Sequence, residues 1–138
     1  MSEIDAADLW LKTVLSGDTE LATLVSGVYD SKAPQGAVMP YVLFSLQAPS
    51  ADVVVVGNIR LGNRPLYLVR AVCEGPSFGP VRTIADMIDD LLHGASGSNV
   101  DGIIYGCARE QPFKLLETTE GKDFRWMGGI YRLWAQEV

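Results

Sequence analysis

Residues 53–74, which read VVVVGNIRLGNRPLYLVRAVCE, constrain the fold more than any other part of this chain. Two runs rich in β-branched and aromatic residues flank the segment LGNRP, and its glycine, asparagine and proline are typical of turns. The pattern predicts a long antiparallel hairpin in which residues 53–61 pair with residues 66–73 around that turn.

The second predicted strand is apolar on both of its faces, because side chains alternate along a strand. One face carries only apolar residues, namely Tyr67, Val69, Ala71 and Cys73. The other face holds Leu66, Leu68 and Val72 and is interrupted only by Arg70. A strand that is apolar on both sides has a partner on both sides, so we expect a helix on one and a neighbouring subunit on the other.

The remaining pattern predicts helices over residues 4–15, 19–25 and 80–93, and strands over residues 28–29, 41–47, 103–108 and 124–138. Residues 113–116 can extend the strand 103–108 after a kink at Pro112. The helix 80–93 has the clearest periodicity, with Pro80 at its first position and an apolar stripe formed by Val81, Ile84, Ala85, Ile88, Leu91 and Leu92. We expect an exposed, flexible segment at 95–99 and a β-bulge at Gly128-Gly129 that reverses which residues point inward.

These elements predict an α+β fold, in which helices pack on one face of an antiparallel sheet that contains a long β-hairpin. At 138 residues the chain is expected to form a single domain, 1–138, that needs neither a metal nor a disulfide to fold. The composition, 48% hydrophobic and 20% charged, is that of a globular protein with a slight apolar surplus.

The net charge of −6 argues against sequence-independent nucleic-acid binding through the overall field of the protein. Cys73 and Cys107 are interpreted as two buried thiols rather than a disulfide, although sequence alone does not decide their geometry. The absence of a signal segment or an apolar run long enough to span a membrane leads us to expect a cytosol-like compartment.

No active site is recognisable, so we expect a structural or binding protein without catalytic residues, metal or cofactor. The single histidine, His93, ends a predicted helix, where the helix dipole favours it. Asp86, Asp89 and Asp90 share the polar side of that helix and are interpreted as solvent-facing rather than as magnesium ligands. Trp10, Trp126 and Trp134 are interpreted as core residues rather than as a platform for stacking bases.

The order of the elements resembles the phage tail-completion proteins, also called tail-to-head joining or tail terminator proteins. The resemblance is carried by the helix that ends at Leu15, by ELATLVSGVY at 20–29 and by PYV at 40–42. It continues through the long hairpin, the helix VRTIADMIDDLLHG at 81–94 and the closing GGIYRLWAQEV at 128–138.

The resemblance implies a small α+β subunit that forms a ring, typically of six copies, at the head-proximal end of the tail tube. Such a ring stops tube polymerisation, meets the tail tube protein on one side and head-neck or connector proteins on the other, and lets DNA pass through its lumen unbound. It would be part of the virion and, during assembly, of the host cytoplasm. An acidic lumen, lined by Asp and Glu rather than Lys and Arg, is a further expectation.

The subunit interface is expected to include the second face of the hairpin and the loops 30–39 and 57–64. The candidate interface residues are Val54, Val56, Arg60, Leu66, Leu68 and Arg70. The alternative is a small ligand-binding or enzymatic α+β domain with a pocket between sheet and helix. In that case Arg82, Asp86 and His93 would be the first residues to test.

Overall fold

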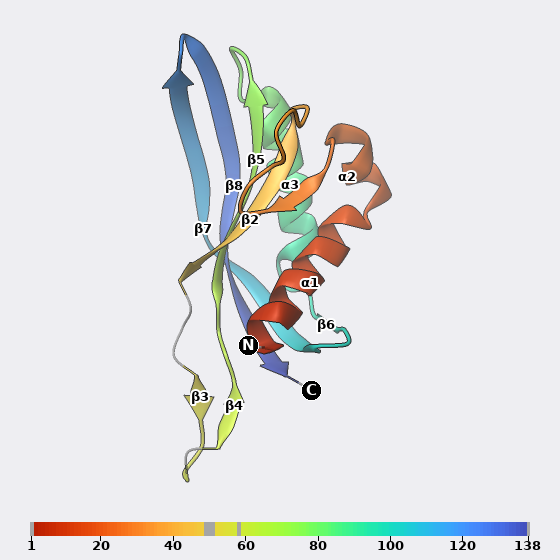
Figure 1. Ribbon diagram of the computed structural model, residues 1–138, viewed down its shortest axis with the longest axis vertical. Coiled ribbons are helices and arrows are strands. Elements are labelled where there is room, and N and C mark those ends of the chain that lie inside the picture. Colours follow the sequence, from red (N-terminus) through yellow and green to blue (C-terminus); the bar gives the residue numbers. More distant parts are fainter. Residues whose placement is uncertain (1, 49–51, 58, 138) are drawn as a thin grey trace.

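In the computed structural model, which describes residues 2–48, 52–57 and 59–137, six strands form one sheet and two short strands form a separate hairpin (Figure 1). The helices are α1 (Ser2–Ser16), α2 (Thr19–Leu24) and α3 (Gly79–Leu92). The strands of the large sheet are β1 (Val28–Asp30), β2 (Tyr41–Ala48), β5 (Leu66–Glu74), β6 (Gly97–Ser98), β7 (Gly102–Thr119) and β8 (Lys122–Glu137). The separate hairpin consists of β3 (Val53–Val54) and β4 (Arg60–Gly62).

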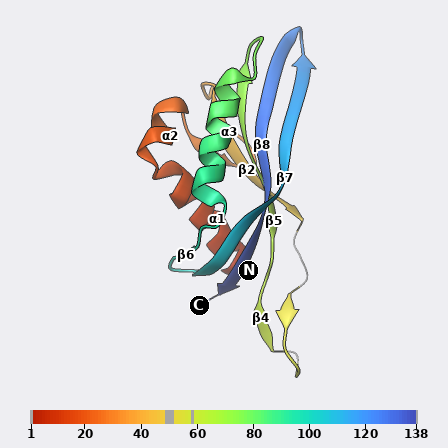
Figure 2. The same cartoon turned by 180° about the vertical axis from the view of Figure 1, so that it is seen from behind.

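The large sheet has the order β1-β2-β5-β8-β7-β6, and the helices lie together on one side of it (Figures 1 and 2). All neighbouring strands are antiparallel except β1 and β2, which run parallel. The predicted α+β fold class is therefore confirmed, with one parallel pair that the sequence pattern did not indicate. The predicted end of the last strand at Val138 lies outside the described residues.

The helices follow their local sequence signals closely. Asp18 caps α2, because its carboxylate accepts a hydrogen bond of 2.9 Å from the Leu21 N–H. The apolar stripe of α3 is buried against the sheet, and Pro80 stands in its first turn. Gly94, directly after the helix, has φ of 81°, a conformation that glycine adopts without strain. None of the helices in the described part of the chain is long and apolar enough to cross a membrane.

Two tyrosines anchor the core between the sheet and the helices. Tyr67 on β5 and Tyr131 on β8 are almost completely buried, at 0% and 1% exposure. The Tyr67 hydroxyl donates to Asp8 on α1 at 2.5 Å, and the Tyr131 hydroxyl donates to Asp89 on α3 at 3.0 Å. Burial of each phenol and its bond to a carboxylate raise its pKa, so both hydroxyls stay protonated as donors. These bonds fix both helices against the sheet.

Trp10 is buried at 5% exposure, which confirms its predicted core position, whereas Trp126 and Trp134 are half-buried. Cys73 and Cys107 are both buried and free, as predicted. The polar side of α3 is solvent-facing at Asp86 and Asp90, but Asp89 is half-buried and lies 3.7 Å from Arg109. Asp89 accepts a hydrogen bond from the buried Tyr131 hydroxyl. The prediction that Asp89 faces solvent was therefore wrong.

The fold contains a long hairpin, but it is not the predicted one: the pairing of residues 53–61 with residues 66–73 around a turn at LGNRP was wrong. Residues 53–54 pair with residues 60–62, and β5 pairs with β2 and β8 instead. The chain passes through Asn63 in an extended form, bridging to Ala135 of β8. The turn residues of LGNRP therefore serve another purpose: Gly62 allows a close approach, since a Cβ there would lie 2.4 Å from the Ala135 oxygen. The long hairpin of the fold is formed by β7 and β8, which Glu120 and Gly121 connect with positive φ values.

The predicted bulge at Gly128-Gly129 was also wrong. The β5–β8 register continues through both glycines without a shift, and the irregularities lie on β7, between Ile104 and Gly106 and between Arg109 and Gln111. Gly128 is needed for another reason, since a Cβ there would stand 2.0 Å from the Val69 oxygen.

The segment 95–99, predicted to be flexible, contains β6, and the Asn99 side chain donates to the Ala6 oxygen at 2.9 Å. The strand continues past Pro112, as predicted, and β7 runs on to Thr119.

Candidate functional site

The hairpin of β3 and β4 projects beyond the chain ends, away from the helices, and is called the arm (residues 53–62, with Asn58 outside the described residues; Figures 1 and 2). Its turn is closed by the Val55 N–H, which donates to the Ile59 oxygen at 2.9 Å, and Gly57 takes φ of 94° within it. The pairing is short, and a two-stranded hairpin alone is only marginally stable in water.

The arm exposes apolar side chains that would normally be buried. Val56 is fully exposed, and the exposed fractions are 64% for Ile59, 52% for Val54, 40% for Val55 and 39% for Leu61. Residues 53–59 contain no charged side chain at all. Scattered apolar residues on a surface are ordinary, but a contiguous uncharged group of this kind is typical of an interaction site.

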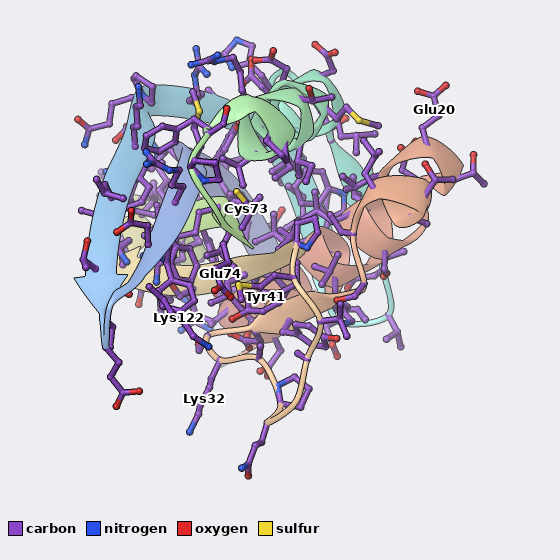
Figure 3. All side chains as sticks on the ribbon, turned by 90° about the horizontal axis from the view of Figure 1, so that it is seen from above. Glu20, Lys32, Tyr41, Cys73, Glu74 and Lys122 are labelled. Atoms are coloured by element: carbon purple, nitrogen blue, oxygen red, sulfur yellow. The ribbon has the colours of Figure 1, made fainter. Side chains whose placement is uncertain are left out.

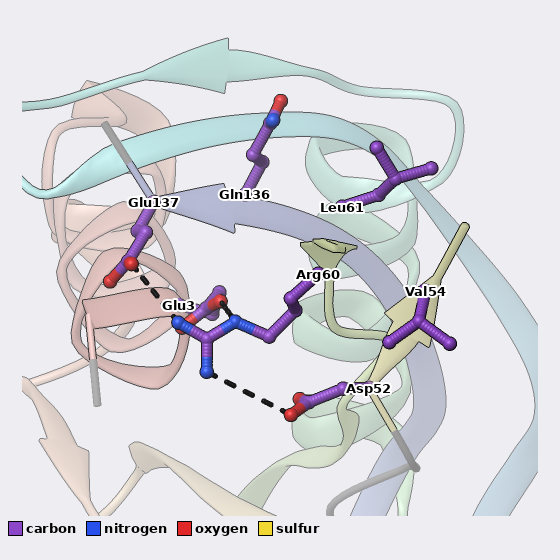
Figure 4. A pocket seen from close by; sticks show the side chains of 7 residues that line it. All are labelled: Glu3, Asp52, Val54, Arg60, Leu61, Gln136 and Glu137. Atoms are coloured by element: carbon purple, nitrogen blue, oxygen red, sulfur yellow. Dashed lines mark hydrogen bonds and ion pairs between the residues drawn. The ribbon is translucent and has the colours of Figure 1, made fainter. Parts of the chain in front are cut away.

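An ion-pair cluster at the base of the arm attaches it to the body (Figure 4). The Arg60 Nε lies 3.0 Å from the Glu3 carboxylate of α1, and its terminal nitrogens lie 3.0 Å from Glu137 and 3.8 Å from Asp52. Glu3 is only 5% exposed, and its carboxylate is the first of several that raise the pKa of Arg60. The Asn63 and Ala135 backbones exchange two hydrogen bonds of 2.8 Å beside it. We call these contacts the latch, because they fix the direction in which the arm leaves the body.

The charged groups in the cleft around Arg60 pair with each other and hold parts of the same chain together. The cleft is lined by Glu3, Asp52, Val54, Arg60, Leu61, Gln136 and Glu137. Its one cation is already surrounded by three carboxylates of the same chain, so it offers little to an anionic ligand. Within the described residues, no group of three His, Cys, Asp or Glu side chains is arranged to hold a metal ion.

The candidate interface residues fall in two places. Val54, Val56 and Arg60 belong to the arm and its latch, whereas the other three lie on β5. Of those, Leu68 is 6% exposed, and Leu66 is half-buried. Leu68 is therefore already covered within the monomer, so its substitution would test folding before it tested any interface.

Arg70 lies between two aromatic side chains on the face of the sheet that points away from the helices. Its guanidinium carbon is 4.3 Å from the ring centre of Trp126 and 5.7 Å from that of Phe113, distances typical of cation–π contact. Burial lowers the pKa of Arg70, and its Nε has no hydrogen-bond partner among the described residues. The half-buried Trp126 thus covers an arginine on this face.

Arg60 was predicted as a subunit-interface residue, which stays a prediction, and the structure pairs it with carboxylates of its own chain. Those pairs were not predicted, because Glu3 and Glu137 lie near opposite ends of the chain. The residues proposed for a ligand site do not form one recognisable centre. Arg82 and Asp86 are exposed on α3, and His93 accepts a hydrogen bond of 3.0 Å from the Arg109 N–H. The side of α3 that faces the sheet is filled by Val81, Ile84, Ile88 and Leu92, all at most 1% exposed.

Comparison with known proteins shows a shared fold. No family model and no curated protein matches the chain. Among solved structures, a chain described as "Virion of native gene transfer agent (GTA) particle" is similar, with a TM-score of 0.75 and 21% sequence identity. The similarity covers 97% of this chain and 97% of that chain. The shared fold therefore extends over nearly the whole of this chain and of a chain of similar size.

Proposed function

We propose that this protein is a structural component of a phage or phage-like virion that forms a closed ring, typically of six copies, at the head-proximal end of the tail. In this role it stops polymerisation of the tail tube and joins the tail to the head. The tube protein and the head-neck proteins are its partners, and DNA passes through the lumen without specific binding.

The observation that carries the proposal is the latched arm, which holds uncharged apolar side chains out in solvent. An arm at one end of a subunit that contacts a different surface on the next copy is a head-to-tail contact, and such contacts form rings when the rotation closes. The net charge of −6 suits a conduit for DNA, which is itself an anion. The fold shared with a virion chain of a gene transfer agent particle supports the virion role.

The first test is light scattering of the purified protein combined with negative-stain imaging, with and without tail tubes. We expect rings about as wide as the tube, either free or at tube ends. Val56→Asp places a charge at the exposed end of the arm and should abolish the rings. Val100→Asp is the matched control, because Val100 is also an exposed valine, at 85%, but lies outside the arm.

Deleting the gene gives the decisive result. We expect full heads and separate tails, with some tails of abnormal length, and we expect Val56→Asp to reproduce this state while Val100→Asp restores joining. Heads and tails that join normally without the gene would contradict the proposed role.

A further inference from the structure

The outer edge of β7 is covered along its first half by residues of the same chain. Strand β6 pairs with it at Ile103 and Ile104. The Gly94 N–H then donates to the Cys107 oxygen at 2.7 Å, and the Arg109 N–H donates to the His93 Nδ1 at 3.0 Å. The end of α3 therefore protects the edge up to Arg109.

The second half of this edge is open. Thr119 pairs with Lys122 across a two-residue turn, so Thr119 and alternate residues before it direct their backbone groups toward β8. The residues between them, Lys114, Leu116 and Thr118, direct their N–H and C=O groups away from β8. Among the described residues, no strand pairs with this part of β7. We call residues 113–119 of β7 the open edge.

The open edge also carries exposed apolar side chains, since Leu115 and Leu116 are 41% and 48% exposed. An unpaired edge with apolar residues readily accepts another strand. Pro112, which has no N–H, stands directly before it and limits how far such pairing could extend along β7.

The arm and the open edge lie at opposite ends of the molecule (Figure 1). The latch around Arg60 holds the arm away from the body, so the arm does not reach the open edge of its own chain. Each copy therefore presents a projecting apolar hairpin at one end and, at the other, an unpaired strand with two exposed leucines between Lys114 and Glu117.

We propose that the arm of one copy adds to the sheet of the next copy by pairing with the open edge of its β7. The added strand pair would satisfy the backbone groups of Lys114, Leu116 and Thr118 and cover Leu115 and Leu116 with the valines of the arm. Because residues 53–59 are uncharged, their burial removes no charge from water. This inference rests on the proposed ring and names the contact that closes it.

Disulfide trapping between copies tests the contact directly. One preparation carries Leu116→Cys, and others carry a cysteine at Val54, Val55 or Val56 in turn; the native thiols are buried. Mixing under mild oxidation should give at least about tenfold more cross-linked dimer for one of these arm positions than for a control partner, because docking raises the effective concentration of the two thiols. The control partner carries Glu20→Cys, since Glu20 points away from the sheet on α2 (Figure 3).

Leu116→Pro is a second test that does not depend on a cysteine. It removes a backbone N–H that points away from β8, so the monomer should keep its fold while ring formation is lost. Leu115→Pro, which removes an N–H bonded to β8, should instead destabilise the monomer. Circular dichroism and light scattering distinguish these two results.

The outcomes separate this contact from the proposed function. Rings that form with Leu116→Pro and show no arm-to-edge cross-link would overturn the contact and leave the ring intact as a proposal. A mixture that remains without cross-links at every protein concentration would also overturn it. Cross-linked copies together with normal joining after gene deletion would support the contact and contradict the role at the tail.

Discussion

The two hairpins at the ends of this molecule are stabilised in different ways. The hairpin of β7 and β8 extends from the main sheet, and β8 contributes Tyr131, Leu133 and Ala135 to the core at 1% exposure or less. The arm has only short pairing between β3 and β4, and its apolar side chains remain in solvent. It keeps its direction through ion pairs and backbone hydrogen bonds at its base.

This difference separates residues that stabilise the fold from residues that are available for association. An apolar side chain contributes to folding only when water is removed from it, which the arm does not achieve within one chain. Substitutions in β8 should therefore change the free energy of unfolding, whereas substitutions in the arm should change assembly.

The largest effect is expected from Gly128→Ala, where β8 approaches β5. The added Cβ would stand 2.0 Å from the Val69 oxygen and 2.6 Å from the Arg70 Cα, and neither backbone atom can move aside easily. We expect a loss of roughly 4 kcal/mol in the free energy of unfolding, measured with urea. Gly57→Ala in the arm is the control: it has free space around it, and its φ of 94° should cost only about 1 kcal/mol. Equal losses for both variants would contradict the distinction.

Truncation of apolar side chains should show the same contrast. Leu133→Ala on β8 opens a cavity at a fully buried site and should cost about 3 kcal/mol. Val56→Ala removes atoms that are fully exposed, so the monomer should change by less than about 0.5 kcal/mol. Ring formation should show the reverse: below the melting temperature of the Leu133 variant, Val56→Ala should weaken rings more than Leu133→Ala does. Thermal unfolding and light scattering together provide the comparison.

Loosening the latch should affect the arm without unfolding the body. Arg60→Gln removes the cation shared by Glu3, Glu137 and Asp52, so the arm should lose its fixed direction. Hydrogen exchange of amides in residues 53–62 should become faster, while β5 and β8 keep their protection. Arg82→Gln on the exposed side of α3 serves as the charge-matched control. Faster exchange throughout the sheet would mean that the latch supports the whole fold.

The smallest expected effect is on the pH dependence of stability and on thiol reactivity, compared between the β7–β8 hairpin and the arm. Burial raises the pKa of Cys107 on β7 to about 12, whereas a free cysteine has a pKa of about 8.5. Between those pH values the folded protein keeps a proton that the unfolded chain releases, so Cys107 makes stability fall as pH rises. Cys107→Ala should reduce this decline. At pH 8 a thiol reagent should react quickly with Val56→Cys in the arm and slowly with Cys107.

Several elements could be predicted because their signals are local. Asp18 caps α2, Pro80 lies in the first turn of α3, and Gly94 follows its end, as their positions in the sequence indicate. The periodic stripe of α3 identified the side that packs on the sheet. Both faces of β5 are buried, as expected for a strand that is apolar on both sides, because Tyr67 and Val69 are covered on one face and Val72 on the other. The expected neighbouring subunit on the second face stays a prediction.

The candidate site was predicted only in part. Val54 and Val56 were predicted to contact a neighbouring subunit, and the structure exposes both in the arm, whereas the contact itself stays a prediction. The open edge of β7 was not identified, because an unpaired edge depends on which strands lie beside it. Nothing in residues 113–119 alone reveals that His93 and Gly94, directly after α3, cover the edge only as far as Arg109.

The sequence by itself determined the positions of the helices, the Asp18 cap of α2 and most of the strand-forming runs, since these depend on side chains a few residues apart. The tertiary structure decided which strands pair, and it made LGNRP an extended connection to β8 instead of a turn. It also brought Glu3 and Glu137 to Arg60 from the two ends of the chain. The physical reason is that strand pairing and side-chain burial depend on contacts between residues far apart in sequence. A short segment does not specify which distant residues will lie beside it.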